Sequence, residues 1–168
     1  GPTGRGFITG NPDLNPETSA QYDFALRYTA PALRLAAFFY HYDIDDLIER
    51  YAAPELGPDN FLFRNRGTAR VRGFELEGQA SFPAGVTLDL AMQIAEGRAL
   101  DDDAYLDDMS PTNFSATLRK QFGDRAFGQV RTAFYSDDEN FGPTERAVPG
   151  YPMLDAAARS RIVRQFEM

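Results

Sequence analysis

Apolar side chains occupy every second position along most extended segments of this chain, and this spacing constrains the fold more than any other feature. A period of two places successive side chains on opposite faces of a β-strand, so each segment has one apolar face. The clearest alternation lies at 86–95, where the apolar positions are Val86, Leu88, Leu90, Met92 and Ile94. About seven such segments occur, near 19–30, 33–42, 61–82, 86–95, 114–122, 126–134 and 153–163. The chain is therefore predicted to be all-β.

Short and long connections between these segments alternate strictly. Short turns lie near 29–32, 83–85 and 123–125, and long polar loops are expected near 43–60, 98–112 and 136–151. Consecutive strands joined by short turns pair as antiparallel hairpins. The expected fold is an antiparallel up-and-down meander of about seven strands, with short turns at one end and long loops at the other.

This arrangement is typical of a transmembrane β-barrel, whose strands of about 9–11 residues alternate between apolar and polar side chains. Aromatic residues near strand ends, such as Phe39, Phe82 and Phe122, stand where an interfacial girdle would lie. Seven strands without a closing strand leave an open edge, which lipid does not tolerate. We therefore expect the chain to be part of a larger barrel.

In the alternation of the segment at 61–82, Arg70 and Arg72 fall on the same face as the apolar Phe74 and Leu76. The membrane interpretation therefore requires either a β-bulge there or a position beyond the hydrocarbon band. The alternative fold is a soluble all-β binding or structural module with no transport role, whose apolar face would be covered by its own second sheet or by a partner.

Composition excludes several other classes of protein. The 168 residues contain no cysteine, which rules out disulfides and Cys-based metal sites, and the net charge of −8 argues against a nucleic-acid partner. No apolar run approaches the roughly 20 residues of a membrane-spanning helix. No phosphate-binding loop, HExxH pair or GxGxxG pattern occurs, so no cofactor is expected.

Three motifs resemble those of TonB-dependent outer-membrane receptors. The stretch GNPDLNPETS at 10–19, followed by an alternating aromatic strand, resembles the barrel-entry motif of that family. Asn65 and Gly67, followed by the GFELE strand at 73–77, resemble its recurrent hairpin, and the proline-led SPTN at 110–113 resembles a later strand start. The resemblance covers nearly the whole chain, from about residue 1 to 161.

The resemblance implies that residues 1–168 are a partial barrel domain, with an entry loop at 1–18, strands and loops at 19–163, and no plug domain. The complete barrel would have roughly 22 strands and a plugged lumen in the outer membrane of a Gram-negative cell. The implied function is TonB-dependent uptake of a scarce nutrient complex such as a ferric siderophore, cobalamin or a glycan. The implied partners are outer-membrane lipid, the rest of the barrel with its plug domain, the TonB complex acting through the plug, and the small nutrient ligand.

Aromatic and acidic residues near the expected outer rim are the candidate ligand-binding residues: Tyr40, His41, Tyr42, Tyr51, Glu75 and Glu77. Aromatic rims bind both chelates and sugars, although an interfacial aromatic belt explains the same residues. The glutamates would face the lumen, where ion pairs with Arg27, Arg34 or Arg119 are the simpler expectation. His41 has no nearby Gly-x-Ser-x-Gly motif, so we do not expect an enzyme.

A cluster of aspartates in the second long loop is a candidate metal site: Asp101, Asp102, Asp103, Asp107 and Asp108. Loops rich in carboxylate oxygens can bind calcium, but the spacing is not that of an EF-hand. A solvated acidic loop explains the same residues.

Overall fold

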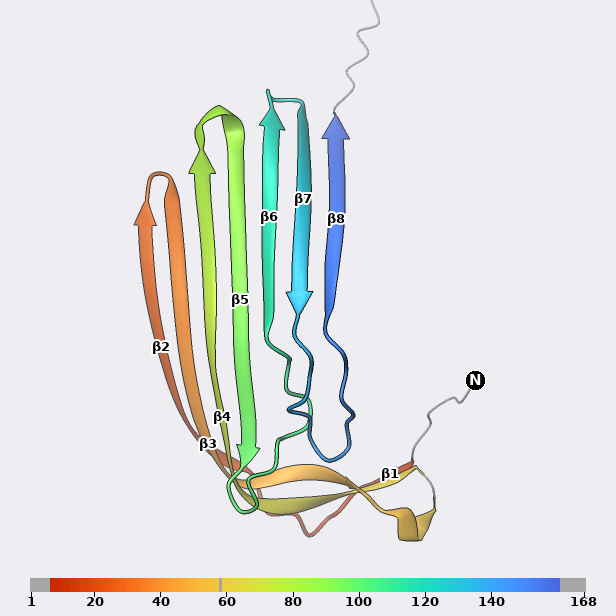
Figure 1. Ribbon diagram of the computed structural model, residues 1–168. Helices are drawn as coiled ribbons and strands as arrows, with labels where there is room; N and C mark the ends of the chain where they lie inside the picture. Colours follow the sequence, from red (N-terminus) through yellow and green to blue (C-terminus); the bar gives the residue numbers. More distant parts are fainter. Residues whose placement is uncertain (1–6, 58, 161–168) are drawn as a thin grey trace, which may run out of the picture.

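Seven long strands follow one another in chain order across one curved sheet (Figure 1). The computed structural model describes residues 7–57 and 59–160. The long strands are β2 (Thr18–Ala30), β3 (Leu33–Ala52), β4 (Asn60–Phe82), β5 (Val86–Ala99), β6 (Asn113–Phe122), β7 (Ala126–Tyr135) and β8 (Tyr151–Ser160). Each pairs antiparallel with the next. The expected all-β meander is confirmed.

Short elements complete the architecture. An additional strand, β1 (Phe7–Thr9), pairs in parallel with the outer end of β4, and the 3₁₀ turns η1 (Pro54–Leu56) and η2 (Pro83–Gly85) lie beside β4. Residues 1–6 of the expected entry loop and 161–163 of the last expected strand lie outside the described residues. Within the part of the chain that is described, no helix has the length and apolar character needed to cross a membrane.

The expected loop at 43–60 is wrong, because most of it is strand. β3 continues to Ala52 and β4 begins at Asn60, so the two form a long hairpin that bends across the lower end of the sheet in Figure 1. Ile44 and Leu47 in the extended part of β3 pack against a small buried cluster of Ala69, Ala99 and Leu106. The apolar residues between the aspartates are thus used for packing at the outer end.

The entry segment is attached to this extended hairpin by hydrogen bonds. The Asn15 backbone N–H donates to Asn65 Oδ1 at 2.7 Å, and Asn65 Nδ2 donates to the Asn15 carbonyl at 3.0 Å. Asn11 Nδ2 also donates to the Phe63 carbonyl at 3.1 Å. The two motifs that the sequence singled out at 10–19 and 65–67 therefore contact each other.

The strand register aligns the apolar side chains into rows on one face of the sheet. One row contains Leu26, Ala37, Leu76, Met92, Phe114 and Phe134. The outermost apolar row contains Phe24, Phe39, Phe74 and Ile94, and the innermost includes Phe82 and Val86. The distance along β4 from Phe74 to Phe82 is about 26 Å at ~3.3 Å per residue, comparable with the apolar band of a membrane barrel before strand tilt is considered.

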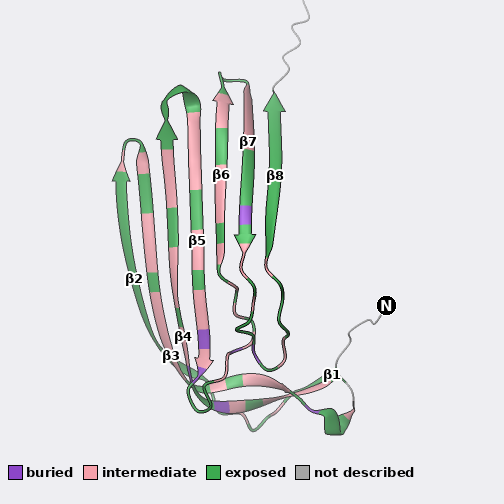
Figure 2. Ribbon diagram, in the orientation of Figure 1, coloured by how far each residue is buried: buried purple, intermediate pink, exposed green. Residues whose placement is uncertain are grey.

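The sheet is a single layer with almost no interior. The buried apolar residues among those described are Ala53, Ala69, Ala99, Leu106 and Ala133, and no large side chain there is fully buried. Phe24 is 61% exposed and Leu26 is 63% exposed, and Figure 2 shows β2 and β8 exposed along nearly their whole length. Within the described residues, no second sheet covers the apolar face in the way that a soluble sandwich requires.

Candidate functional site

The face opposite the apolar rows carries the polar side chains of the same strands. One of its rows crosses β3 to β8 and contains Phe38, Glu75, Gln93, Asn113, Tyr135 and Tyr151. Asn113 Nδ2 donates to Gln93 Oε1 at 3.3 Å, and the rings of Tyr135 and Tyr151 stack with their centroids 4.9 Å apart. This row offers aromatic rings, amides and a carboxylate to whatever lies against the polar face.

Tyr40 and Tyr42 stack on the polar face. They lie one and two rows nearer the long loops than the row that contains Phe38 and Glu75. Their ring centroids are 5.4 Å apart with 26° between the planes. The Tyr42 hydroxyl donates to Asp23 Oδ1 at 3.0 Å, and the Gln93 side chain lies near the Tyr40 hydroxyl. Gly73 makes room for Tyr40, because a Cβ at that position would overlap the phenol ring. Tyr40 therefore packs against β4, and Tyr42 is bonded to β2.

Glu77 lies further toward the short turns, in an open cavity of about 470 Å³ that is also lined by Arg27, Arg34, Gln79 and Asp89. Gln79 Nε2 donates to Asp89 Oδ1 at 2.7 Å. Glu77 and Arg27 approach the cavity from strands that are separated by β3, since Arg27 pairs with Ala36 and Ala36 with Glu77.

The ion pairs expected between the polar-face acids and three arginines do not form within the described residues. The Arg27 guanidinium lies 5.1 Å from the centroid of the Phe38 ring, and that of Arg119 lies 3.9 Å from the centroid of the Phe127 ring. Two strand spacings, about 9.6 Å, separate the Arg27 and Glu77 backbones, and the Arg27 cation lies over the Phe38 ring of the intervening strand.

The structure does not bring all four expected aromatics together. Consecutive residues of a strand point to opposite faces, so His41 lies on the apolar side, with its ring centroid 6.4 Å from that of Tyr22. Its Nε2 is 3.2 Å from Asp43 Oδ2. Tyr51 lies on the extended hairpin, with the Arg64 guanidinium 4.8 Å from its ring centroid. Tyr40 and Tyr42 therefore remain as the aromatic pair of the polar face.

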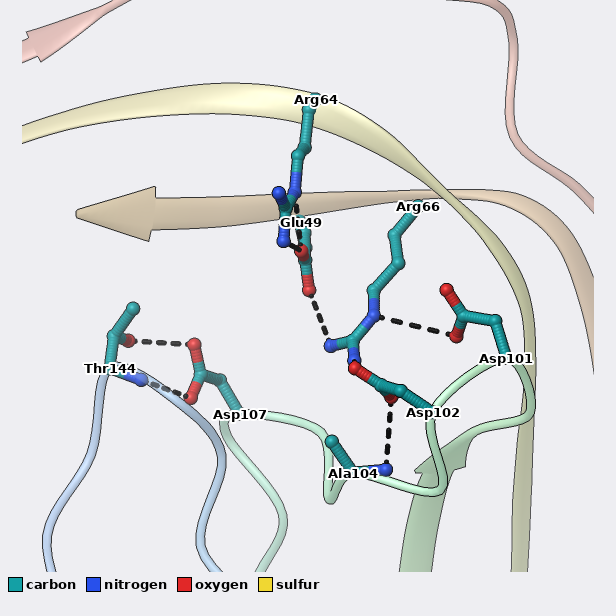
Figure 3. Close-up of polar contacts among 8 residues, drawn as sticks. All are labelled: Glu49, Arg64, Arg66, Asp101, Asp102, Ala104, Asp107 and Thr144. Atoms are coloured by element: carbon teal, nitrogen blue, oxygen red, sulfur yellow. Dashed lines mark hydrogen bonds and ion pairs between the residues drawn. The ribbon is translucent and has the colours of Figure 1, made fainter. Parts of the chain in front are cut away.

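A buried arginine, which sequence reasoning did not identify, organises the outer end of the sheet (Figure 3). The Arg66 side chain is only 7% exposed, and its Nη1 lies 2.9 Å from Glu49 Oε2. Its Nε lies 3.6 Å from Asp101 Oδ1, and its Nη2 forms a close ion pair with Asp102. Glu49 also accepts a hydrogen bond from Arg64 Nε at 2.7 Å. Arg66 thus links β3, β4 and the loop at 100–112.

The third long connection joins this assembly through Thr144. Asp107 accepts hydrogen bonds from the Thr144 backbone N–H at 3.0 Å and from its hydroxyl at 2.6 Å (Figure 3). Arg50 Nη2 donates to Thr144 Oγ1 at 3.2 Å. The hairpin at 44–68 and the loops at 100–112 and 136–150 therefore form one connected unit, called the outer cap below.

The five aspartates of the candidate metal site do not converge on one point. Asp101 and Asp102 face Arg66, Asp103 lies 2.9 Å from Arg98 Nη1, Asp107 binds Thr144, and the Asp108 backbone N–H donates to Glu145 Oε1 at 2.9 Å. Across residues 7–57 and 59–160, no group of three or more His, Asp or Glu residues is arranged to hold a metal ion. The Ala104 backbone N–H and the Arg66 guanidinium lower the pKa of Asp102, so this carboxylate serves as a structural anion.

A family model described as "TonB dependent receptor-like, beta-barrel" matches residues 1–167. The chain belongs to this family. TonB-dependent receptors are β-barrels of the Gram-negative outer membrane, so the apolar rows face lipid, the polar face lines the lumen and the long loops are external. Arg70 and Arg72 lie beyond the apolar band, as the membrane interpretation required, and the soluble-module alternative is wrong.

The proteins that this chain resembles are transporters and receptors by name, which agrees with the expectation that the chain is not an enzyme. The vitamin B12 transporter BtuB of Vibrio vulnificus is 28% identical over 155 residues, which are 92% of this chain and 24% of the transporter. The copper transporter OprC superposes with a TM-score of 0.83 at 19% identity, covering 90% of this chain and 24% of OprC.

A further solved structure, the FrpB iron transporter of Neisseria meningitidis, has a TM-score of 0.69 at 13% identity, covering 94% of this chain and 26% of FrpB. The structural similarities, all at low identity, concern the fold. The chain spans about a quarter of the length of these relatives.

Proposed function

We propose that this chain is a section of the barrel of a receptor for TonB-dependent active uptake of a scarce nutrient complex across the outer membrane. Residues 1–168 would supply part of the barrel wall, part of the lumen surface and three external connections. The rest of the barrel and a plug domain would complete the lumen, and the TonB complex would act through the plug. The family match over nearly the whole chain carries this proposal.

The stacked pair Tyr40 and Tyr42 supports a ligand-contacting role for the polar face. Aromatic faces bind the planar rings of chelates and the apolar faces of sugars. Asp23, Glu75 and Gln93 surround the pair with hydrogen-bond acceptors and an amide, and these groups fit a large ligand with exposed amide or hydroxyl donors. Because the pair lies just below the outer cap, an incoming ligand would meet it soon after passing the loops.

Cobalamin is the first ligand to test, because the 28% identical relative is named a vitamin B12 transporter. Ferric siderophores, copper and glycans are tested next. Iron and copper are included because two similar solved structures are named iron and copper transporters. The test expresses the receptor that contains this chain in a Gram-negative host lacking its own receptor for each nutrient. Uptake of the labelled nutrient is then measured with and without a protonophore.

The expected result is uptake of one nutrient class that stops when the protonophore collapses the proton gradient. Accumulation that is insensitive to the protonophore, or no accumulation of any of the four classes, would contradict the proposal. A second arm compares Tyr42→Ala with Tyr22→Ala, which removes the same ring from the lipid-facing side. Loss of one stacked ring predicts two- to tenfold weaker ligand binding in Tyr42→Ala, about 0.5–1.5 kcal/mol, and unchanged binding in the control.

A further inference from the structure

The pairing of β3 with β4 is interrupted near the place where the hairpin bends away from the wall (Figure 1). Along 33–52, all of which is described, the register skips only the pair of Asp46 and Gly67. Asp46 has a φ of 54°, in the left-handed region that residues other than glycine seldom adopt. Ile44 and Leu47 both pack against the small buried cluster at the outer end, although residues three apart in a regular strand face opposite sides. The strand therefore reverses its faces at this break, and residues 47–66 beyond it are called the outer hairpin below.

The entry segment passes the break and is attached to the hairpin on both sides of it. On the side of the barrel wall, Thr18 at the start of β2 pairs with Asp45. On the outer side, β1 pairs with residues 60–62 of β4, and Asn11 Nδ2 donates to the Phe63 carbonyl at 3.1 Å. Residues 7–18 therefore connect the outer hairpin to the wall without passing through the break.

Two side chains supply hydrogen bonds at the break itself. Asn65 Nδ2 donates to the Asp46 carbonyl at 2.8 Å, and Glu17 Oε2 accepts from the Ile48 backbone N–H at 2.9 Å. Asn65 also bonds both backbone groups of Asn15, accepting at 2.7 Å and donating at 3.0 Å. A skipped pair removes hydrogen bonds of the ladder, and a backbone group left without a partner is costly. Asn65 and Glu17 therefore bond the entry segment to the hairpin where the hairpin's own pairing is missing.

The outer hairpin is held from both of its faces at this point. Consecutive residues of a strand face opposite sides, so Arg66 and Asn65 are bound from different directions. Arg66 binds Asp101 and Asp102, which belong to a loop, whereas Asn65 is bound by the entry segment, which continues directly into the paired strand β2. A loop can follow the hairpin when the hairpin moves, but a paired strand cannot. The entry segment is therefore the firmer of the two attachments.

We propose that the entry segment is a strap that fixes the bend of the outer hairpin, with Asn65 and Glu17 as the positioning residues. A left-handed backbone at a residue other than glycine persists only where neighbouring contacts hold it, and hinges move by changes of φ and ψ at a few such residues. The strap supplies these contacts at Asp46 and thereby sets the position of the outer cap relative to the wall. The inference does not depend on the nutrient that the receptor transports.

The test measures the position of the outer hairpin in the receptor that contains this chain, reconstituted in lipid nanodiscs. Spin labels are attached to cysteines introduced at Leu56, near the hairpin tip, and at Phe122, at the inner end of β6. Both positions are 58% exposed, and this chain has no cysteine of its own. Cysteines elsewhere in the receptor are replaced. Pulsed electron paramagnetic resonance then gives the distribution of the distance between the labels, and a second pair at Phe82 and Phe122 within the wall reports whether the barrel is folded.

The wild type should show one narrow distance between positions 56 and 122. The variant Glu17→Ala/Asn65→Ala removes the hydrogen bonds at the break and should lose this narrow distance in favour of a broad distribution, while the distance within the wall stays narrow. Glu17→Gln should retain the narrow distance, because glutamine keeps an oxygen acceptor for the Ile48 N–H. The matched control Asn11→Ala removes an asparagine bond between the same two segments away from the break, and it should also retain the narrow distance.

Three outcomes would overturn the proposal. A narrow distance in the double variant would mean that the ion pairs of Arg66 hold the bend without the strap. Equal broadening in Asn11→Ala would mean that the bonds at the break have no special role, and a broad distribution in the wild type would mean that the bend is not fixed. If the wall distance shows that the double variant does not fold, the milder Glu17→Ala is compared with Glu17→Gln, and equally narrow distributions in these two would contradict the role of Glu17.

Discussion

Arg66 is expected to hold the outer cap together, and Arg66→Met tests this because methionine fills similar space without the charge. Breaking a fully buried ion pair by removing one partner costs about 3–5 kcal/mol. The cost here should be smaller, because Glu49 keeps its contact with Arg64, and the side chains of Asp101 and Asp102 are 49% and 56% exposed to water. We therefore expect the cap to lose about 2 kcal/mol of local stability.

Amide hydrogen exchange measures this loss directly, since two hydrogen bonds outside the main strand pairing join the end of β5 to the cap. The Ala99 N–H donates to the Ala104 carbonyl at 2.9 Å, and the Leu106 N–H donates to the Gly97 carbonyl at 3.0 Å. A loss of 2 kcal/mol in the free energy of local opening corresponds to about 30-fold faster exchange at these amides. Amides in the middle of β6 and β7 should be unaffected.

The matched control is Arg64→Met, which removes another arginine that binds Glu49. Arg64 is 53% exposed, so its ion pair contributes at most about 0.5–1 kcal/mol, and exchange should rise only two- to fivefold. If Arg66→Met and Arg64→Met accelerate exchange at Ala99 and Leu106 equally, burial of Arg66 does not organise the cap and the reasoning fails.

Three other expectations follow from the same contacts. Gly73→Ala places a Cβ on the Tyr40 ring and should lower the free energy of unfolding by about 1–3 kcal/mol, and an unchanged denaturation midpoint would contradict this contact. Leu90→Arg puts a charge in the lipid band and should lower the free energy of unfolding from the bilayer by about 2–4 kcal/mol. Ala91→Arg, on the polar face, should lower it much less, and equal losses would mean that the two faces are misassigned. The pKa of Asp102 is lowered in the folded protein, so its ion pair should stabilise the cap fully at any pH above the ordinary pKa of 3.8. This stabilisation should be lost only as the pH falls through the lower pKa of the folded state. The distance between spin labels at Leu56 and Leu100 should therefore stay constant from pH 7 to about pH 5. A broader distribution of that distance already near pH 6 would contradict the stabilising role of the Asp102 ion pair.

The meander and its two faces could be predicted from local pattern, because a strand's side chains alternate whatever its neighbours are. The parity of Phe74, Leu76 and Leu90 assigns them to one face before any pairing is known. The same rule applied strictly would have separated His41 from Tyr40 and Tyr42, since consecutive strand residues cannot share a face. That error came from grouping residues by proximity in sequence.

The extent of the β3–β4 hairpin could not be read from local pattern. The acidic residues at 43–49 resemble a loop by composition, yet Ile44 and Leu47 find apolar partners on β4, on β5 and in the loop at 100–112. Strand pairing depends on residues that are distant in the sequence, because a second segment must offer both hydrogen bonds and a surface to pack against. Only the folded chain supplies that surface.

The sequence by itself determined the number of long strands, their order and their two faces, because these depend on side-chain period and turn residues over a few positions. Tertiary structure decided which residues from distant parts of the sequence contact each other. Arg66 reaches Asp101 and Asp102 from another strand, Tyr40 lies over Gly73, and Arg70 stands opposite Arg98 through the register of β4 and β5. These contacts depend on how strands align side by side, and no window of local sequence contains both partners.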